Sequence, residues 1–357
     1  MPEAEDPSII DNLGDEFEEE IPFDYSITSY GADPTVDGLV QRMRKEDILI
    51  PPFQRGYVWN YRQACRFIES LLLGLPVPGI FFSKEDETER LLVIDGQQRL
   101  RTLQYFYDGV FEPTKKEFEL RGVHSKFVGL TYKTLPNEIR RKLDNAILHA
   151  TIVRQDKPSD ENSSVYLIFE RLNTGGTELQ PQEIRAAIYH GEFNELLKSL
   201  NKVPAWREIF GPVSSKTRDQ ELILRFLGLY FRTDKYESPM KRFLNTYMSG
   251  NRHLKVNSAE ELRSTFVSTI ELAFRSLGKG AFRPERALNA AVFDAVMVGL
   301  ARRLQSGPIT NPAEIVTKYA TLLQLDNFKE NTERATARKD KVRARIELAT
   351  AAFASVS

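Results

Sequence analysis

The spacing of apolar residues divides the chain into two regions. Between about residues 22 and 190, short apolar runs alternate with helical patterns and turn residues. From about residue 191 onward, apolar residues recur at three- and four-residue intervals, as in residues 218–231 and 287–304, without a repeat of fixed period. These patterns predict an α/β N-terminal domain over residues 22–190 and an all-α C-terminal domain over residues 191–357.

The first region contains a readable order of elements. Apolar runs bounded by Pro, Gly or charged residues predict strands, and apolar residues at helical spacing predict helices. The predicted elements are a strand at Glu46–Ile50, a helix at Tyr61–Leu73, strands at Gly79–Ser83 and Arg90–Ile94, and a helix at Leu100–Tyr107. The charged turn between the two later strands indicates a hairpin.

The turn between the last strand and the last helix, Asp95–Arg99, is the strongest candidate for chemistry. Gly96 lets a ligand approach the backbone, and the N–H groups of a helix N-terminus favour an anion. The Arg99 guanidinium suits a phosphate, and Asp95 can hold Mg²⁺ or orient a water. Gln97 and Gln98 add neutral donors. The alternative is a polar turn in which Asp95 and Arg99 pair with each other, and no Walker sequence occurs in the chain.

A second candidate is the segment Pro52–Trp59, which places two aromatic rings beside a Gln and an Arg. Arg55, Tyr57 and Trp59 suit a platform that stacks on a base and neutralises a phosphate. The alternative is that Tyr57 and Trp59 anchor a loop on the core, as large aromatic residues commonly do.

A third candidate is a helix–loop–helix. A helix at Ser164–Leu172 is predicted to stop at Asn173–Gly176, and Pro181 is predicted to begin the next helix. The loop can present Asn173 to a ligand. The alternative is a helix–helix corner held by salt bridges among Glu170, Arg171, Glu183 and Arg185.

These three motifs together resemble the GmrS-type N-terminal domain family, whose members have a ParB/sulfiredoxin-like fold. The matching stretches are Phe53–Trp59, Asp95–Leu103 and Phe169–Ala187, and the resemblance runs from about residue 30 to residue 250. It implies a hydrolase that acts on nucleoside triphosphates in defence against phage or modified DNA, together with an HNH-type nuclease, fused or separate. Gly96 and Arg99 keep the G-x-x-R spacing of the phosphate-binding turn of that fold.

The resemblance also implies roles for single residues. Asp95, Gln98 and Arg99 are expected to be catalytic. Nucleotide or DNA binding is expected of Gln54, Arg55, Tyr57, Trp59, Gly96, Gln97, Thr102 and Asn173. Mg²⁺ is the expected metal, with Asp95 as its candidate ligand, and no organic cofactor is implied.

The second half of the chain lacks the paired histidines and asparagines of an HNH nuclease. The leading hypothesis is therefore a nucleotide-hydrolysing DNA sensor or regulatory subunit that acts with a separate nuclease. One alternative is a non-catalytic reader of modified DNA, and another is a ParB-like domain that nicks DNA itself. Whether the chain forms a homo-oligomer stays open.

The charge is distributed unevenly, although its formal sum is −1. Residues 1–37 hold 12 acidic and no basic residues, which leaves 49 basic against 38 acidic residues in the rest of the chain. Residues 1–21 are expected to be a disordered or loosely docked arm. The arm is either a solvated tail or a shield over a basic DNA-binding groove of this protein or of a partner, so the near-neutral sum does not exclude DNA.

A basic segment near the end of the chain is a further candidate for DNA contact. Lys329–Arg345 carries seven Lys or Arg against three acidic residues. As one continuous helix, it would place Arg334, Arg338, Lys341 and Arg345 on a single face that can follow phosphates. The alternative is a solvated helix end whose charge suits the helix dipole.

Three simple features predict the compartment. The single cysteine, Cys65, excludes an internal disulfide and a multi-cysteine zinc site. No run approaches 18 apolar residues, and the N-terminus lacks the pattern of a secretory signal. We therefore expect a cytoplasmic protein without a membrane span.

Overall fold

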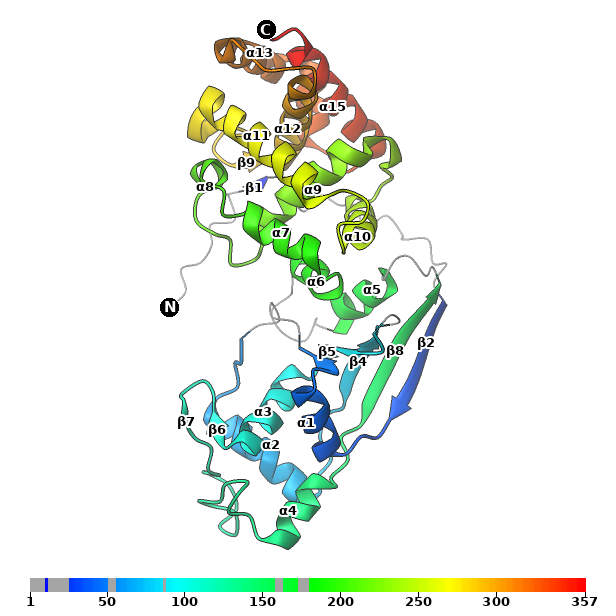
Figure 1. Cartoon of the computed structure of the whole chain (residues 1–357), viewed down its shortest axis with the longest axis vertical. Coiled ribbons are helices and arrows are strands. Elements are labelled where there is room, and N and C mark those ends of the chain that lie inside the picture. The colour runs from blue at the N-terminus through cyan, green and yellow to red at the C-terminus, as the bar shows by residue number, and fades with distance from the viewer. Residues whose placement is uncertain (1–9, 12–25, 51–55, 86–87, 158–162, 173–179) are drawn as a thin grey trace. The chain divides into compact units, whose positions relative to one another are not determined.

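The computed structural model describes residues 10–11, 26–50, 56–85, 88–157, 163–172 and 180–357. The chain divides into two compact units (Figure 1). The α/β unit comprises residues 24–179, and the helical unit comprises residues 180–357 together with residues 1–23. The domain boundary predicted at residue 190 lies beyond α6 (Pro181–Ile188), which this division places in the helical unit.

The α/β unit is built around a mixed five-stranded sheet with the strand order β2-β8-β4-β5-β3. The strands are β2 (Ser26–Ala32), β8 (Ala150–Lys157), β4 (Ile80–Lys84), β5 (Leu91–Asp95) and β3 (Ile48–Leu49). The pairs β2–β8 and β4–β5 are antiparallel, whereas β8–β4 and β5–β3 are parallel. A separate hairpin joins β6 (Val110–Phe111) to β7 (Lys116–Glu117).

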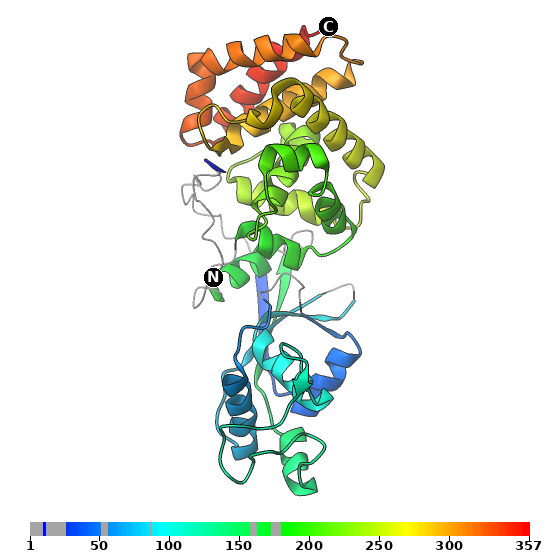
Figure 2. The same ribbon diagram turned by 90° about the vertical axis from the view of Figure 1, so that its left-hand side faces the viewer.

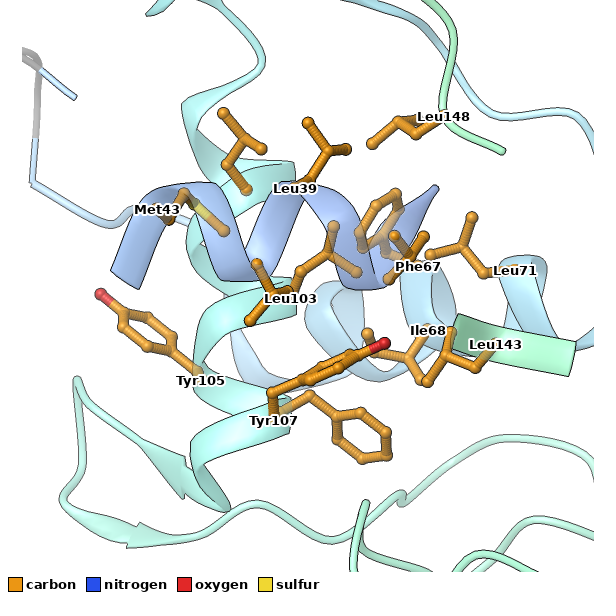
Figure 3. Packing of buried hydrophobic residues seen from close by; sticks show 14 of the residues in the cluster. Leu39, Met43, Phe67, Ile68, Leu71, Leu103, Tyr105, Tyr107, Leu143 and Leu148 are labelled. Carbon is orange, nitrogen blue, oxygen red and sulfur yellow. The ribbon is translucent and has the colours of Figure 1, made fainter. Parts of the chain in front are cut away.

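Four helices pack with one face of this sheet. They are α1 (Val36–Arg44), α2 (Tyr61–Leu73), α3 (Gln97–Asp108) and α4 (Asn137–Asp144). Leu39, Ile68, Leu103 and Leu143, one from each helix, meet in the cluster that Figure 3 shows, and sheet residues such as Val93 join it.

The other face of the sheet packs against α5 (Ser163–Leu172), which contacts β5 and β8. Leu91 and Val93 join the cluster with the four helices, while the alternate residues Leu92 and Ile94 are buried outside that cluster. Strands covered on both faces lose the polar alternation, which explains why Leu91–Ile94 is a continuous apolar run.

The helical unit packs its helices around α12 (Ala290–Gln305), of which the first twelve residues are all buried. Figure 2 shows the helices of this unit from a second direction. The remaining helices are α7 (Glu192–Leu200), α8 (Pro204–Phe210), α9 (Arg218–Arg232), α10 (Met240–Asn251), α11 (Ala259–Leu277), α13 (Pro312–Gln324), α14 (Asp326–Glu333) and α15 (Lys339–Ala354), with short 3-10 turns at Thr233–Lys235 and Gly278–Gly280. Among the described helices, none combines the length and the apolar character needed to span a bilayer.

The acidic arm is described only at β1 (Ile10–Asp11). Its backbone pairs in parallel with β9 (Leu288–Asn289), just before α12. The other residues of the predicted arm, 1–9 and 12–21, lie outside the described residues.

The predicted α/β-then-helical arrangement is confirmed, and most element positions agree. The helix predicted at Tyr61–Leu73 has those bounds because Asn60 and Gln63 form a capping box and Gly74 ends the helix in the left-handed conformation. The helix predicted to begin at Leu100 begins at Gln97 instead, so three residues of the DGQQR turn belong to its first turn.

Candidate functional site

The candidate site begins where β5 ends and α3 begins. Gly96 is the N-cap residue of α3, with a φ of 102°, a conformation that L-residues other than glycine adopt with strain. A Cβ at this position would lie 3.0 Å from Cγ1 of Ile80, so the turn also packs closely against β4. Since Gly96 has no side chain to cap the first turn of α3, the helix N-terminus keeps donors for a ligand.

Arg99 is held in place by two acceptors at this turn. Its Nη2 donates to Oδ2 of Asp95 at 2.7 Å and to the carbonyl oxygen of Gly79 at 2.9 Å. Its Nε is buried and has no hydrogen-bond partner. The Arg99 side chain is 13% exposed, whereas that of Asp95 is 48% exposed, so the pair lies at the surface with its cation recessed. The Asp95–Arg99 pair expected of a purely polar turn is therefore present. The Nε donor of Arg99 is left without an acceptor.

Gln98 joins the turn to the aromatic segment. Its Oε1 accepts from the backbone N–H groups of Val58 at 3.0 Å and Trp59 at 3.3 Å. Its Nε2 lies 3.5 Å from the carbonyl oxygen of Gly56. The Gln98 side chain, which was expected to be catalytic, thus bonds the backbone of Gly56, Val58 and Trp59 in one loop, which is the geometry of a positioning residue.

Thr102 makes the second link between the two motifs. Its buried hydroxyl donates to the carbonyl oxygen of Gln98 at 2.7 Å, and the hydroxyl of Tyr57 lies 2.6 Å from it. The one hydroxyl hydrogen of Thr102 is donated to the carbonyl of Gln98. The hydroxyl of Tyr57 is therefore the donor in the second bond. Burial raises the pKa of Tyr57 to about 12, against the lowering effect of this bond, so the phenol keeps its proton at neutral pH.

Both aromatic residues of the segment also pack on the core. Tyr57 meets Tyr105 and Phe111 edge to face, with ring centroids 5.1 and 5.6 Å apart. Trp59 meets Phe67 of α2 in the same way at 5.6 Å. These contacts agree with the interpretation of Tyr57 and Trp59 as loop anchors. Their predicted stacking on a base stays a prediction.

Several predicted site residues have no described geometry. Gln54, Arg55 and Asn173 lie outside the residues that the structure describes. Gln97 is described and partly exposed in the first turn of α3. The structure therefore brings together Asp95, Gly96, Gln98, Arg99, Thr102, Tyr57 and Trp59.

The second half of the helix–loop–helix motif, which begins at α6, has a structural role. Pro181 begins α6 as predicted, and Glu183 closes a capping box with Gln180, whose backbone N–H lies 2.7 Å from Oε2 of Glu183. Arg185 is 1% exposed and bonds Asn245 at 2.8 Å and Glu221 at 3.2 Å. Arg185 therefore forms its ion pair with Glu221 of α9 within the helical unit, and the salt-bridged corner among Glu170, Arg171, Glu183 and Arg185 stays a prediction.

The basic face predicted for Lys329–Arg345 is wrong. The segment is not one helix, because α14 ends at Glu333, Ala335 has a φ of 51°, and α15 begins only at Lys339. The break changes the helical phase, and Arg345 is fully buried with its Nη2 3.0 Å from Oδ2 of Asp294. A buried guanidinium that belongs to the core cannot follow phosphates.

Few described side chains could bind the expected Mg²⁺. Among the described residues, no group of three or more His, Cys, Asp or Glu side chains is arranged to hold a metal ion. Asp95 is the carboxylate at the turn, and one of its oxygens already accepts from Arg99. Mg²⁺ commonly binds through one or two carboxylates together with substrate phosphates and waters. Asp95 fits that mode and does not by itself form a metal site.

Three further residues at the same edge of the sheet were not predicted as site residues. Gly79, whose carbonyl holds Arg99, begins the segment into β4, and Asp33 and His149 pair at 2.5 Å beside β2 and β8. They share no local motif, because the parallel pairing of β4 with β8 brings them together from distant positions. Gly79, the first residue of a predicted strand, was the one available signal.

A known family model matches the part of the chain that contains this site. Residues 36–190 match the family model described as "GmrSD restriction endonuclease, N-terminal domain". The matched region contains a GmrSD-type N-terminal domain. The match covers β5, the DGQQR turn, α3 and the Gly56–Trp59 loop, so the predicted recognition is confirmed. A comparison with curated proteins gave no match.

Proposed function

We propose that this chain is a nucleotide-hydrolysing, DNA-binding component of a restriction system against phage DNA, including modified DNA, and that it acts with a separate HNH-type nuclease. The proposal includes a ParB/sulfiredoxin-like fold for the GmrSD-type domain. The observation that carries it is the junction of the two motifs: Gln98 and Thr102 fasten the Gly56–Trp59 loop to the helix that begins at the DGQQR turn.

The proposed binding mode places the phosphates of a nucleoside triphosphate at Gly96 and the first turn of α3. Backbone N–H groups and the helix dipole favour the anion there, and Arg99 supplies a fixed positive charge. The unmet Nε donor of Arg99 supports a ligand at this place. Arg55, from the matching upstream motif, is proposed to face the same phosphates.

Asp95 has the proposed role of orienting the attacking water. Its partly exposed carboxylate is fixed on one oxygen by Arg99, which leaves the other oxygen to accept from water. Mg²⁺, when bound with the nucleotide, would neutralise charge on the phosphates. Gln98 has the proposed role of positioning, because it holds the loop rather than a reacting group.

The test is phosphate release from ATP, GTP, CTP and UTP, with and without modified DNA. Arg99→Ala and Asp95→Ala are expected to reduce release about 100-fold or more, and Arg99→Lys is expected to recover part of it, since it restores charge without the fork. Gln104→Ala, a partly exposed α3 residue, is the matched control with unchanged release. Full hydrolysis by folded Asp95→Ala and Arg99→Ala proteins would show the assignment to be wrong.

One observation favours a second candidate, the non-catalytic reader of modified DNA. Asp95 is already engaged with Arg99, and the described residues offer no further carboxylate cluster for a metal. A protein that hydrolyses none of the four triphosphates, yet binds DNA only when the DNA is modified, would establish this second function instead.

A further inference from the structure

An open hollow lies in the α/β unit, outside the residues predicted for nucleotide binding. The end of α2, the segment that follows it, the end of α4 and the start of β8 enclose a volume of about 600 Å³. Small-molecule sites commonly measure roughly 300–1,000 Å³, so the hollow has the size of a ligand site.

The charged residues that line the hollow, Arg141 and Lys142, are both basic. His149 also contributes to the wall, and no Asp or Glu does. In the described part of the chain, neither Arg141 nor Lys142 forms an ion pair or a side-chain hydrogen bond, whereas the adjacent Arg140 bonds Asn137 at 2.6 Å. Two exposed cations without a counter-charge in one concave surface favour an anion.

His149 is oriented at the edge of this hollow. Its Nδ1 lies 2.5 Å from Oδ1 of Asp33, which fixes the ring and leaves Nε2 as the nitrogen available to a ligand. The wall itself is tied to the start of α1 and the residues before it by backbone bonds from Val36 to Ala146 at 2.9 Å and from Leu148 to Pro34 at 3.1 Å. The basic groups therefore sit on a preformed wall.

Exposed apolar side chains also line the hollow. Leu75, after α2, and Ile147, before β8, are each 52% exposed. Exposed aliphatic surface beside unpaired cations suits a ligand that carries an anionic group and an apolar or planar body.

The hollow is distinct from the DGQQR turn, although the same short segment borders both. Val77 lines the hollow, while Gly79, two residues later, gives its carbonyl to Arg99. Asp95, Gly96 and Arg99 are absent from the lining.

We propose that this hollow is a second anion site that binds a nucleoside monophosphate unit. The phosphate lies against Arg141 and Lys142, and the base and sugar cover Leu75 and Ile147. The unit comes either from a free nucleotide or from a nucleotide within single-stranded DNA, since both present the same phosphate and base. The site goes beyond the proposed hydrolysis and does not depend on it.

The test measures dissociation constants of the full-length protein for deoxyadenosine monophosphate, inorganic phosphate and a single-stranded oligonucleotide. The double variant Arg141→Ala/Lys142→Ala is expected to weaken monophosphate binding about tenfold or more, because charge-assisted hydrogen bonds are lost. Lys126→Ala/Lys133→Ala, which removes two exposed lysines outside the hollow, is the matched control and is expected to leave binding unchanged.

A second variant separates the base contact from the charge contact. Ile147→Ser is expected to weaken monophosphate binding severalfold and to leave inorganic phosphate binding unchanged, because it removes apolar contact only. An oligonucleotide that competes with the monophosphate identifies DNA as the source, and monophosphate binding without such competition identifies a free nucleotide.

Three results would overturn the proposal. They are the absence of monophosphate binding to the wild-type protein, equal binding by the Arg141→Ala/Lys142→Ala variant, and loss of binding in Arg99→Ala instead. The last result would place the nucleotide at the DGQQR turn. Conversely, loss of hydrolysis in Arg99→Ala with intact monophosphate binding keeps the two sites separate, so failure of one proposal is distinguishable from failure of the other.

Discussion

The two units of the chain place their charged residues in opposite ways. Among the described residues, every buried charged side chain belongs to the helical unit: Arg185, Asp219, Glu221, Arg225, Asp294 and Arg345. The buried polar side chains of the α/β unit are uncharged, namely Ser83, Thr102 and Thr131. The helical unit therefore uses charges to join helices, whereas the α/β unit keeps its charges at the surface, where a ligand can reach them.

The centre of the buried network is Asp294 on α12. Its Oδ2 accepts from Arg225 at 2.7 Å and from Arg345 at 3.0 Å. Burial disfavours the charge of Arg225, but the attraction of Asp294 outweighs burial and raises its pKa. For Arg345, burial prevails over the same attraction and lowers the pKa. One carboxylate thus serves two buried cations, and its loss would leave both uncompensated.

The sharpest test of this comparison is Asp294→Ala. We expect a loss of about 3–5 kcal/mol in the free energy of unfolding, because two guanidinium groups would remain buried without their counter-charge. Chemical denaturation followed by far-ultraviolet circular dichroism measures it. A loss under about 1 kcal/mol would mean that the buried network does not stabilise the helical unit.

A smaller loss is expected from Gly96→Ala in the α/β unit. The substitution adds a Cβ at a φ of 102° and 3.0 Å from Ile80, which we expect to cost about 1–3 kcal/mol of folding stability. Gly250→Ala is the control, because no atom lies within 4 Å of its added Cβ and its φ is not positive. Equal unfolding free energies for the two variants would contradict the strained turn.

The link between the two motifs is testable by a double-mutant cycle. Thr102→Val and Tyr57→Phe each remove the bond between these side chains, and we expect each to cost about 1–2 kcal/mol. The double variant should cost less than the sum, with a coupling of at least about 0.5 kcal/mol. Additive losses in thermal or chemical unfolding would show that the bond does not join the loop to α3.

The smallest effect is expected from Asp108→Ala, the surface counterpart of Asp294→Ala. Asp108 pairs with Arg44 at 2.5 Å, and both side chains are about two-fifths exposed. An exposed ion pair contributes about 0–1 kcal/mol, so the unfolding free energy should change little. A loss that approaches that of Asp294→Ala would remove the distinction between the two units.

Much of the α/β unit was predictable because its signals are local. Asn60, Gln63 and Gly74 mark both ends of α2, and in the helical unit Pro181 marks the start of α6 in the same way. The turn at Asp95–Arg99 was recognised from five consecutive residues, and the family match agrees with it. The start of α3 was placed three residues late, because polar residues in a first helical turn look the same as a loop in sequence.

The charged residues of the helical unit were not predictable in the same way. Arg345 appeared as one member of a basic surface stripe, yet the break after Glu333 turns it into the core beside Asp294. The same limit applies to His149 and Asp33, which lie 116 residues apart and meet only through the sheet. Contacts of this range depend on strand order and helix phase, which no local pattern contains.

By itself, the sequence determined the order of the five α/β elements between residues 46 and 107, the helical character of the second half, and the GmrSD-type signature at the DGQQR turn. The tertiary structure alone decided which polar residues serve the core and which remain at the surface. Capping, turn and periodicity signals act over a few residues, whereas burial of a charge depends on the partner that folding brings beside it. For this reason Arg99 was identified as a site residue from its neighbours in the sequence, whereas the ion pair of Arg345 with Asp294 was not predicted.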